Sequence, residues 1–442
     1  MRRQTRRTFL ATVGAAGAAG LAGCSAFGSD DSSTTSTKST TKKGDGKGTT
    51  STKGGNDTTT NDGGNQQSGP ETFESFEKLG NWSATSGQGS LKKSTKVKYE
   101  GSQSAHITGS KKTKYGQIKR VNFGSNPADL SDKNLSIAYK CTSHKESKVD
   151  IELYAPDRGH IVTLKRTLYG PKGKWVRINL GVTNQMDPKK IDLSKIYGIR
   201  ITGRPRDPNT TTPIEFYVDD LKTVPAPEKG MVMLTFDDGA ESQYSVAYKK
   251  YMKKYGFPGV DAIITDAVFD DGYLNRTQMN EMVGDGWDMI SHPNTGAKSM
   301  DQRSRKNQEQ LMKESQQWLK QYGYEGYKYM AVPKNVVGAD TFELAKKYYD
   351  VTMTFGGSPN ALPVIKKNTL ISRAYGDSSV KTSKQLIDYA ARYKQLTPLL
   401  FHRIGGDEGF SEKKFKAILD HIKKSNVEVV TLSDLEKKGM II

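Results

Sequence analysis

Short apolar runs alternate with longer amphipathic segments through the second half of the chain. The runs Met231–Leu234, Val260–Thr265 and Val351–Phe355 have the length and apolar content of buried strands. Apolar residues at helical spacing predict helices over Thr277–Val283, Met300–Tyr322, Asp340–Tyr349, Ser383–Tyr393 and Ser411–Lys424. Strands that alternate with helices form mainly parallel sheets. The pattern therefore predicts an α/β domain whose strands close into a barrel.

The segment from residue 70 to residue 225 has a different pattern, in which short β-type runs recur with turns between them. These runs are Ser136–Lys140, Val149–Tyr154, Ile161–Tyr169, Trp175–Leu180, Gly198–Thr202 and Ile214–Val218. Their spacing predicts an antiparallel β-sandwich. The stiff Pro-Ala-Pro-Glu sequence at 225–228 marks the boundary, so the α/β domain is expected over residues 229–442.

The N-terminal region has the features of an exported protein. Residues 5–10, Thr-Arg-Arg-Thr-Phe-Leu, form a twin-arginine export motif, and the signal peptide is expected over residues 1–23. The Ala/Gly-rich stretch that follows the motif is too short to predict a membrane-spanning helix. From residue 29 to 69 the chain has no aromatic or large aliphatic side chain, which predicts a disordered tether.

The sequence Leu-Ala-Gly-Cys at 21–24 resembles a lipobox, in which a signal peptidase cuts before a cysteine that carries lipid. The resemblance implies that Cys24 anchors the protein to the outer face of the cell membrane and that residues 24–69 are the anchor and linker. An ordinary signal peptide with a chance cysteine is the alternative. If Cys24 is acylated, no intrachain disulfide is possible, and Cys141 is expected to be a lone thiol buried in a strand.

The chain is strongly basic, with a net charge of +19 and a pI of about 9.5. A basic surface favours acidic partners such as anionic wall polymers or lipid head groups. No nucleic-acid-binding motif is present in the sequence, and nucleic acid is not an expected partner. Nothing in the pattern indicates an oligomeric state.

Candidate chemistry lies at the ends of the strands predicted in the second domain. The Thr-Phe-Asp-Asp-Gly sequence at 235–239 places Asp237 and Asp238 in the loop after the first strand, where α/β folds build active sites. Of two such acids, one can bind a metal while the other stays free as a base, although an acidic turn explains the pair equally well on its own. Two further predicted strands end at His292 and His402, so two histidines are expected near the acid pair.

Residues 229–442 resemble a polysaccharide deacetylase, the carbohydrate esterase family that removes acetyl groups from chitin-like, peptidoglycan-like or xylan-like polymers. The sequence at 235–239 matches the first motif of that family residue for residue. The sequence Ser-His at 291–292 matches the start of the second motif, and Leu-Phe-His at 400–402 matches the last. The resemblance implies that Asp237 is the catalytic base, that Asp238 and His292 bind a divalent metal such as Zn²⁺, and that His402 is the general acid.

The second motif of the family ends with another metal-binding histidine, four residues after the first. This chain has Gly296 at that position, and glycine has no side chain that binds metal. Catalytic zinc sites usually have three protein ligands. Three polar residues of the same loop are the candidates to complete the metal site: Asn294, Ser299 and Asp301.

The third motif usually has an arginine two residues before a proline, and this chain has Ala331 before Pro333. Arg373 is the candidate that replaces the missing positive charge. The main expectation is a membrane-tethered deacetylase that acts on an acetylated polysaccharide. A carbohydrate-binding lipoprotein on a deacetylase scaffold is the second possibility. A solute-binding component of a transporter fits the linker and lipobox but not the motif at 235–239.

The ends of the predicted sandwich, Thr72–Glu77 and Phe216–Leu221, resemble those of jelly-roll carbohydrate-binding modules. In such modules the closing strand carries an aspartate near a structural calcium ion, so the resemblance implies calcium at Asp220. An exposed acidic turn explains Asp220 equally well. Four aromatic residues either stack on sugar rings or, as expected for most of them, fill the core: Trp82, Tyr115, Tyr154 and Trp175.

Overall fold

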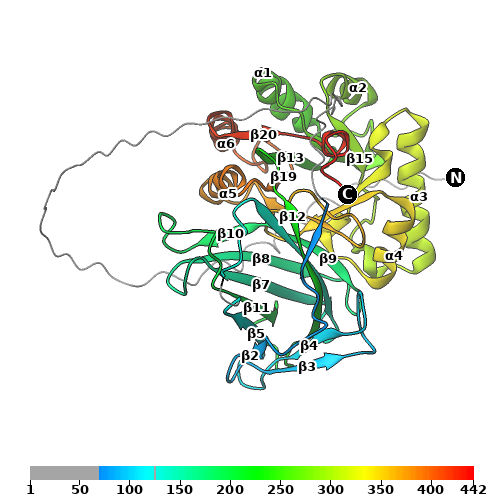
Figure 1. The fold of residues 1–442 in the computed structure, drawn as a ribbon. Coiled ribbons are helices and arrows are strands. Elements are labelled where there is room, and N and C mark those ends of the chain that lie inside the picture. The colour runs from blue at the N-terminus through cyan, green and yellow to red at the C-terminus, as the bar shows by residue number, and fades with distance from the viewer. Residues whose placement is uncertain (1–68, 124–125) are drawn as a thin grey trace, which may run out of the picture. The chain divides into compact units, whose positions relative to one another are not determined.

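The computed structural model describes residues 69–123 and 126–442. The expected signal peptide, Cys24 and the linker up to residue 68 lie outside the described residues. The described residues belong to one compact unit, in which a β-sandwich is followed by an α/β barrel (Figure 1). None of the helices in the described part of the chain has the length and apolarity needed to span a membrane.

The sandwich consists of two six-stranded antiparallel sheets, as the spacing of the apolar runs predicts. One sheet has the order β3-β4-β12-β6-β9, with β1 paired to β12, and the other has the order β10-β8-β7-β11-β5-β2. The strands are β1 (Glu71–Glu74), β2 (Ser83–Ala84), β3 (Ser90–Ser94), β4 (Ser104–Thr108), β5 (Gly116–Val121), β6 (Lys133–Cys141), β7 (Glu146–Tyr154), β8 (Ile161–Tyr169), β9 (Val176–Leu180), β10 (Val182–Gln185), β11 (Gly198–Pro205) and β12 (Glu215–Pro225).

The sandwich core is made by alternate residues of strands from both sheets. Trp82 and Tyr154 are buried, as expected for core aromatics, whereas Tyr115 is exposed and Trp175 is partly buried. Cys141 is a buried free thiol at the end of β6, which confirms its prediction.

The surroundings of Asp220 do not support the calcium site expected there. This residue is buried, and one of its carboxylate oxygens accepts a hydrogen bond from the guanidinium group of Arg177. The other oxygen lies 3.3 Å from Nζ of Lys222. Two cationic side chains therefore already neutralise the carboxylate, and a calcium ion would have to compete with both.

The barrel is a closed ring of seven parallel strands, which confirms the predicted α/β fold class. The ring closes because β13 pairs with both β14 and β19, and β20 adds beside the start of β13. Its strands are β13 (Gly230–Asp238), β14 (Val260–Ile263), β15 (Asp288–Ser291), β16 (Tyr329–Ala331), β17 (Val351–Phe355), β18 (Ile371–Tyr375), β19 (Leu396–Phe401) and β20 (Val427–Val429).

Helices cover the outside of the barrel (Figure 1). The longer ones are η1 (Gln243–Met252), which continues into α1 (Lys253–Tyr255), α2 (Arg276–Gly284), α3 (Arg305–Gln321), α4 (Ala339–Tyr348), α5 (Val380–Tyr393), α6 (Glu412–Lys424) and α7 (Leu432–Lys437). The short turns are η2 (Thr265–Ala267), η3 (Met300–Gln302), η4 (Glu325–Lys328) and η5 (Pro333–Asn335). The helix predicted over Met300–Tyr322 is divided, because the Ser304 side chain accepts a hydrogen bond from the backbone N–H of Asn307 and caps α3.

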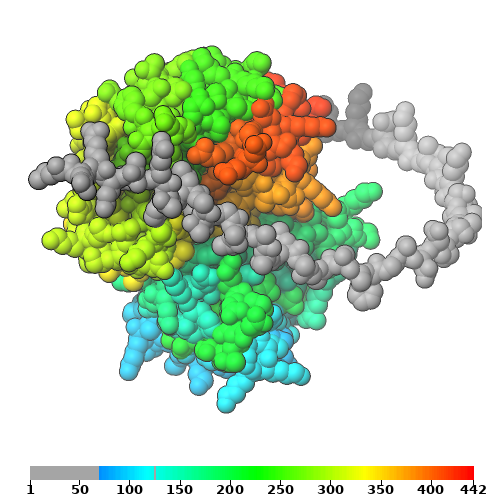
Figure 2. Space-filling view, turned by 180° about the vertical axis from the view of Figure 1, so that it is seen from behind, coloured from blue at the N-terminus to red at the C-terminus, as the bar shows by residue number. Residues whose placement is uncertain are grey.

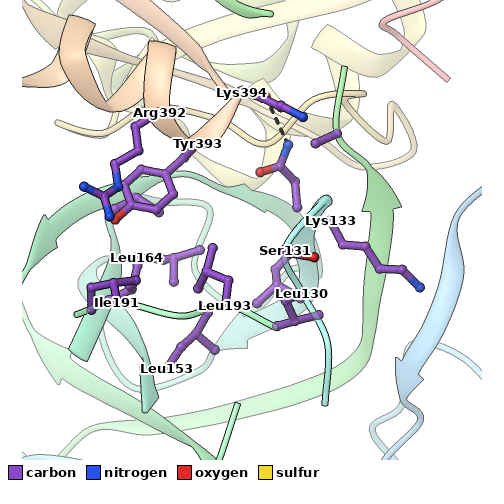
Figure 3. A pocket seen from close by; sticks show the side chains of 15 residues that line it. Leu130, Ser131, Lys133, Leu153, Leu164, Ile191, Leu193, Arg392, Tyr393 and Lys394 are labelled. Carbon is purple, nitrogen blue, oxygen red and sulfur yellow. Dashed lines mark hydrogen bonds between the residues drawn. The ribbon is translucent and has the colours of Figure 1, made fainter. Parts of the chain in front are cut away.

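Hydrogen bonds join the sandwich to the barrel, and Figure 2 shows their atoms in direct contact. Nδ2 of Asn179 donates to Oγ1 of Thr369 at 2.7 Å, and the backbone N–H of Val182 donates to Oε1 of Gln395 at 2.7 Å. A cavity of about 160 Å³ lies at this junction, between sandwich aliphatic side chains and residues 392–394 (Figure 3). These residues precede β19, so the cavity lies near the end of the barrel opposite to Asp237.

Candidate active site

The C-terminal ends of the barrel strands bring the predicted site residues to one end of the barrel. Asp237 and Asp238 end β13, and His292 follows β15. Arg373 lies within β18, and His402 follows β19. This is the end of parallel barrels where active sites are built.

A fully buried ion pair joins Asp237 to Arg373. Nη1 of Arg373 lies 2.6 Å from Oδ1 of Asp237, and Nη2 lies 3.0 Å from Oδ2. Nη2 also donates to Oδ1 of Asn335 at 3.2 Å. Arg373 therefore places a positive charge from β18 directly beside Asp237.

The charges around Asp237 keep its carboxyl group ionised. Burial raises the pKa of this group, but the positive charge of Arg373, with smaller contributions from His292 and His402, brings the pKa below its ordinary value. Two hydrogen bonds from Arg373 leave lone pairs of the carboxylate free, since a carboxylate offers about four acceptor sites. Asp237 is therefore an ionised carboxylate with remaining capacity to accept a proton.

Asp238 and His292 meet beside this pair. Oδ1 of Asp238 lies 3.5 Å from Nε2 of His292. Nδ1 of His292 lies 3.0 Å from the carbonyl oxygen of Ala331. In the neutral imidazole, Nδ1–H donates to this carbonyl, so Nε2 presents its lone pair towards Asp238, which is how metal-binding histidines are usually oriented. Asp238 has a φ of 80°, an uncommon conformation for a residue other than glycine that is found preferentially at functional sites.

The three candidates for a further metal ligand have other partners. Oδ1 of Asn294 accepts from the backbone N–H of Gly296 at 3.1 Å, and Oγ of Ser299 donates to Asp301 at 2.6 Å. The other carboxylate oxygen of Asp301 pairs with Lys145. Within residues 69–123 and 126–442, no group of three His, Cys, Asp or Glu side chains is arranged to hold a metal ion. A carboxylate and an oriented imidazole fit a divalent metal chemically, but they supply two protein ligands where catalytic zinc usually has three.

His402 is held by an acid that the sequence analysis did not identify. Nδ1 of His402 lies 3.0 Å from Oδ2 of Asp377, in the loop after β18. Burial lowers the pKa of His402, but the Asp377 hydrogen bond and the charges of Asp237, Asp377 and Asp238 outweigh it and raise the pKa to about 9. The imidazole is therefore protonated at neutral pH.

Two further residues missed by the sequence analysis lie near the site. Nε2 of the buried Gln243 donates to the carbonyl oxygens of Asp237, at 2.6 Å, and His402, at 3.1 Å, and so ties the two loops together. Asp261 is buried on β14, and its carboxylate has no hydrogen-bond partner among the described residues. Burial, together with the charges of Asp237 and Asp238, raises the pKa of Asp261 well above its ordinary value.

Comparison with protein-family models matches residues 225–352 to the family described as Polysaccharide deacetylase. Asp237, Asp238 and His292 lie inside the matched segment, whereas Arg373 and His402 lie beyond it. No curated protein matches the chain.

Among solved structures, the chain is similar to the Streptococcus pyogenes deacetylase PplD in complex with acetate, with 27% identity over 30% of this chain and a TM-score of 0.28. The match spans 59% of the length of that protein. It is also similar to the Xyl-CE4 domain of a multidomain xylanase from the hindgut metagenome of Trinervitermes trinervoides, with 21% identity, 48% of this chain, 92% of that chain and a TM-score of 0.35.

A third similar structure is a family 4 acetyl xylan esterase from Clostridium thermocellum in complex with a cobalt ion. It is 16% identical, with 48% of this chain and 93% of that chain covered and a TM-score of 0.36. The family match, over the segment that carries Asp237, Asp238 and His292, supports a polysaccharide deacetylase domain in the barrel of this protein.

Proposed function

We propose that this protein is a metal-dependent polysaccharide deacetylase that hydrolyses N- or O-linked acetyl groups of a cell-surface or extracellular glycan. The observation that carries the proposal is the presence, at one end of the barrel, of an ionised acid, Asp237, held by Arg373, and a protonated histidine, His402, held by Asp377. A base and an acid in opposite protonation states at the same pH are what general acid–base hydrolysis requires.

Asp237 is the proposed general base. It takes a proton from the attacking water, whose oxygen forms a bond to the acetyl carbon. Arg373 holds the carboxylate in place, but it also lowers the pKa of Asp237, and a base of low pKa accepts a proton less readily. The structure thus favours precise placement of Asp237 over high basicity.

Asp238 and His292 are the residues that would hold a divalent metal ion. Such an ion, when bound, polarises the acetyl carbonyl group and lowers the pKa of water. The contact of Nδ1 of His292 with the carbonyl oxygen of Ala331 leaves Nε2 free for this purpose. The exposed carboxylate of Asp238 is open to the solvent from which the ion would come.

His402 is the proposed general acid. As the bond between the acetyl carbon and the sugar nitrogen or oxygen breaks, His402 gives its proton to the departing amine or alcohol, and acetate is the other product. Asp377 keeps the imidazole protonated and fixes its orientation through the contact at Nδ1. Nε2 is then the atom that carries the transferred proton.

The competing proposal is a carbohydrate-binding lipoprotein with a weakened or inactive site, and the two-ligand metal position favours it. Acetate release from acetylated xylan and from N-acetylglucosamine oligomers, with metal content measured on the purified protein, separates the two. For the enzyme we expect one equivalent of divalent metal, with metal and activity both lost in Asp238→Ala and His292→Ala. Unchanged hydrolysis in His292→Ala would contradict the assignment.

We also propose that the protein is exported by the twin-arginine route and held by lipid on Cys24, with the sandwich acting as a carbohydrate-binding module. The motifs at 5–10 and 21–24 support this anchoring. We expect Cys24→Ala to release the protein from membranes, and Arg6→Lys with Arg7→Lys to block export. Unchanged export of the double variant would indicate the general secretory route.

A further inference from the structure

We propose that Arg166, a residue of the β-sandwich, is a positioning residue for the candidate active site. Arg166 holds strand β18 in the place where Arg373 meets Asp237. This inference rests on the proposed function, to which it adds a contribution from the sandwich.

Arg166 occupies a position on β8 that alternation assigns to the core. Its neighbours on the same face, Leu164 and Leu168, are buried in the sandwich core. Arg166 is buried as well, and burial lowers its pKa to about 9. No carboxylate of the described residues forms an ion pair with it. A buried cation at a core position is costly unless its hydrogen bonds are satisfied, so the fold depends on the partners of Arg166.

The partners of Arg166 are neutral, and most belong to the barrel segment between β17 and β18. Nε donates to Oγ of Ser358 at 2.7 Å. Nη2 donates to the carbonyl oxygen of Pro359 at 3.0 Å and to Oδ1 of Asn360 at 3.1 Å. The remaining bond goes to the carbonyl oxygen of Asn179 in the sandwich, at 2.8 Å. The guanidinium group therefore fixes residues 358–360 against the sandwich.

Two of these barrel residues hold Ser372, which directly precedes Arg373. Oδ1 of Asn360 accepts from the backbone N–H of Ser372 at 2.9 Å, and Nδ2 of Asn360 donates to its carbonyl oxygen at 2.8 Å. Oγ of Ser358 lies 3.3 Å from Oγ of Ser372. Ser358 and Asn360 thus each connect Arg166 to Ser372 of β18 through buried hydrogen bonds.

Close packing at Gly356 keeps β8 next to this strand. A Cβ at Gly356 would lie 2.3 Å from Oγ of Ser372 and 2.6 Å from Cδ of Arg166, so a larger residue does not fit. The backbone N–H of Thr167 donates to the carbonyl oxygen of Gly356 at 3.0 Å. The sandwich strand and the end of β17 therefore meet through the backbone as well as through Arg166.

The position of β18 matters because it sets where the guanidinium group of Arg373 lies relative to Asp237. This group contacts Asp237 and Asn335, and Nε of Arg373 has no hydrogen-bond partner among the described residues. A displacement of about 1 Å at a catalytic group can cost about 10²-fold in rate. Loss of the Arg166 contacts would release residues 358–360 and allow such a displacement of Arg373.

A double-mutant cycle separates positioning from simple stabilisation of the fold. We expect Arg166→Met to lower kcat for acetylated xylan by about 10-fold to 10²-fold, with little change in KM, and Arg166→Lys to recover part of the loss. In an Arg373→Met background, Arg166→Met should cause no further loss of kcat, while its effect on melting temperature stays the same. An equal kcat loss in both backgrounds, or no loss in either, would overturn the proposal.

Asn134→Ala is the matched control, because this buried sandwich residue also bonds to the barrel, at the carbonyl oxygen of Leu362, without touching Ser372. Its kcat should equal that of the wild type. If Arg166→Met does not fold, Ser358→Ala provides the milder test, since it removes the Nε partner of Arg166 and the contact with Ser372. An unchanged kcat in that variant would likewise count against the proposal.

A readout without catalysis keeps this inference separate from the proposed function. The Nε–H resonance of Arg373 can be assigned by its loss in Arg373→Met. We expect it to shift in Arg166→Met and to stay in place in Asn134→Ala. A shift with no hydrolysis by the wild type would retain the positioning role and reject the deacetylase. An unshifted resonance in a hydrolysing protein would reject the positioning role alone.

Discussion

The two halves of the candidate site differ in how completely they are built. The acid–base half consists of two held pairs. The two carboxylate oxygens of Asp237 lie 2.6 and 3.0 Å from the guanidinium nitrogens of Arg373, and Nδ1 of His402 lies 3.0 Å from Oδ2 of Asp377. The metal half consists of Asp238 and His292, whose Oδ1 and Nε2 atoms lie 3.5 Å apart. Among the described residues no third side chain completes a metal-binding group with them. The side chain of Asp238 is 44% exposed, whereas that of Asp237 is 5% exposed.

The difference follows from the cost of burying charge. A buried carboxylate requires a paired cation or hydrogen bonds, since an isolated buried charge is strongly unfavourable. Asp237 and Arg373 therefore depend on each other for their burial in the folded protein. The Asp238 side chain is largely solvated, so the fold does not require a bound cation beside it. The comparison suggests that a weakness of this site, if hydrolysis is slow, lies in metal retention and not in proton transfer.

The largest effect is expected from removing the base. Asp237→Asn keeps the shape of the side chain but cannot take a proton, so we expect a loss in kcat of about 10²–10⁴-fold. The variant also leaves Arg373 without its buried counter-charge, so melting temperature must be measured beside the rate. A rate near that of the wild type would show that the acid–base half is not used.

The next effect tests the acid. His402→Ala should reduce the rate on acetamido sugars much more than on an activated acetyl ester, because a good leaving group needs no proton. Both substrates are to be compared at the same pH with the same enzyme preparation. An equal loss on the two substrates would make His402 structural and would favour the carbohydrate-binding alternative.

A smaller effect, a gain in metal affinity, is expected from a substitution four residues after His292. Gly296→His returns a third ligand to the loop that follows His292, and we expect the affinity for Zn²⁺ to rise at least about 10-fold, the lower end of what even indirect changes around a metal site produce. Gly296 has a φ of 56°, which histidine adopts more readily than most residues. Gly296→Ala is the control for backbone strain. An affinity equal in both variants would mean that this loop does not face the metal.

The sequence predicts the site residues that lie at strand ends. It does not predict the residues whose role depends on contacts with distant parts of the chain. Asp237, His292 and His402 were predicted from apolar runs that stop at a polar residue, and the barrel brings these ends together. Strand β18 did not stand out, because Ser372 and Arg373 interrupt its apolar pattern, so Asp377 after it was missed. The role of Arg166 was missed as well, because its barrel partners lie about 190 residues away along the chain and no local sequence pattern indicates such contacts.

The smallest effect concerns the pH range of the acid–base half. The pKa of about 9 for His402 depends on its hydrogen bond to Asp377. For the wild type we expect a bell-shaped profile, with an acid limb from protonation of Asp237 and an alkaline limb as the pH rises through about 9, where His402 loses its proton. In Asp377→Asn the hydrogen bond to a carboxylate and the charge of Asp377 are removed, while those of Asp237 and Asp238 stay, so the pKa of His402 falls in part and the alkaline limb moves to lower pH. The variant should therefore lose more activity at pH 8 than at pH 6, as pH–rate profiles on an acetamido sugar would show. An alkaline limb at the same pH in both proteins would mean that a group other than His402 causes the fall in activity. Asp377 would then have no role in keeping the general acid protonated.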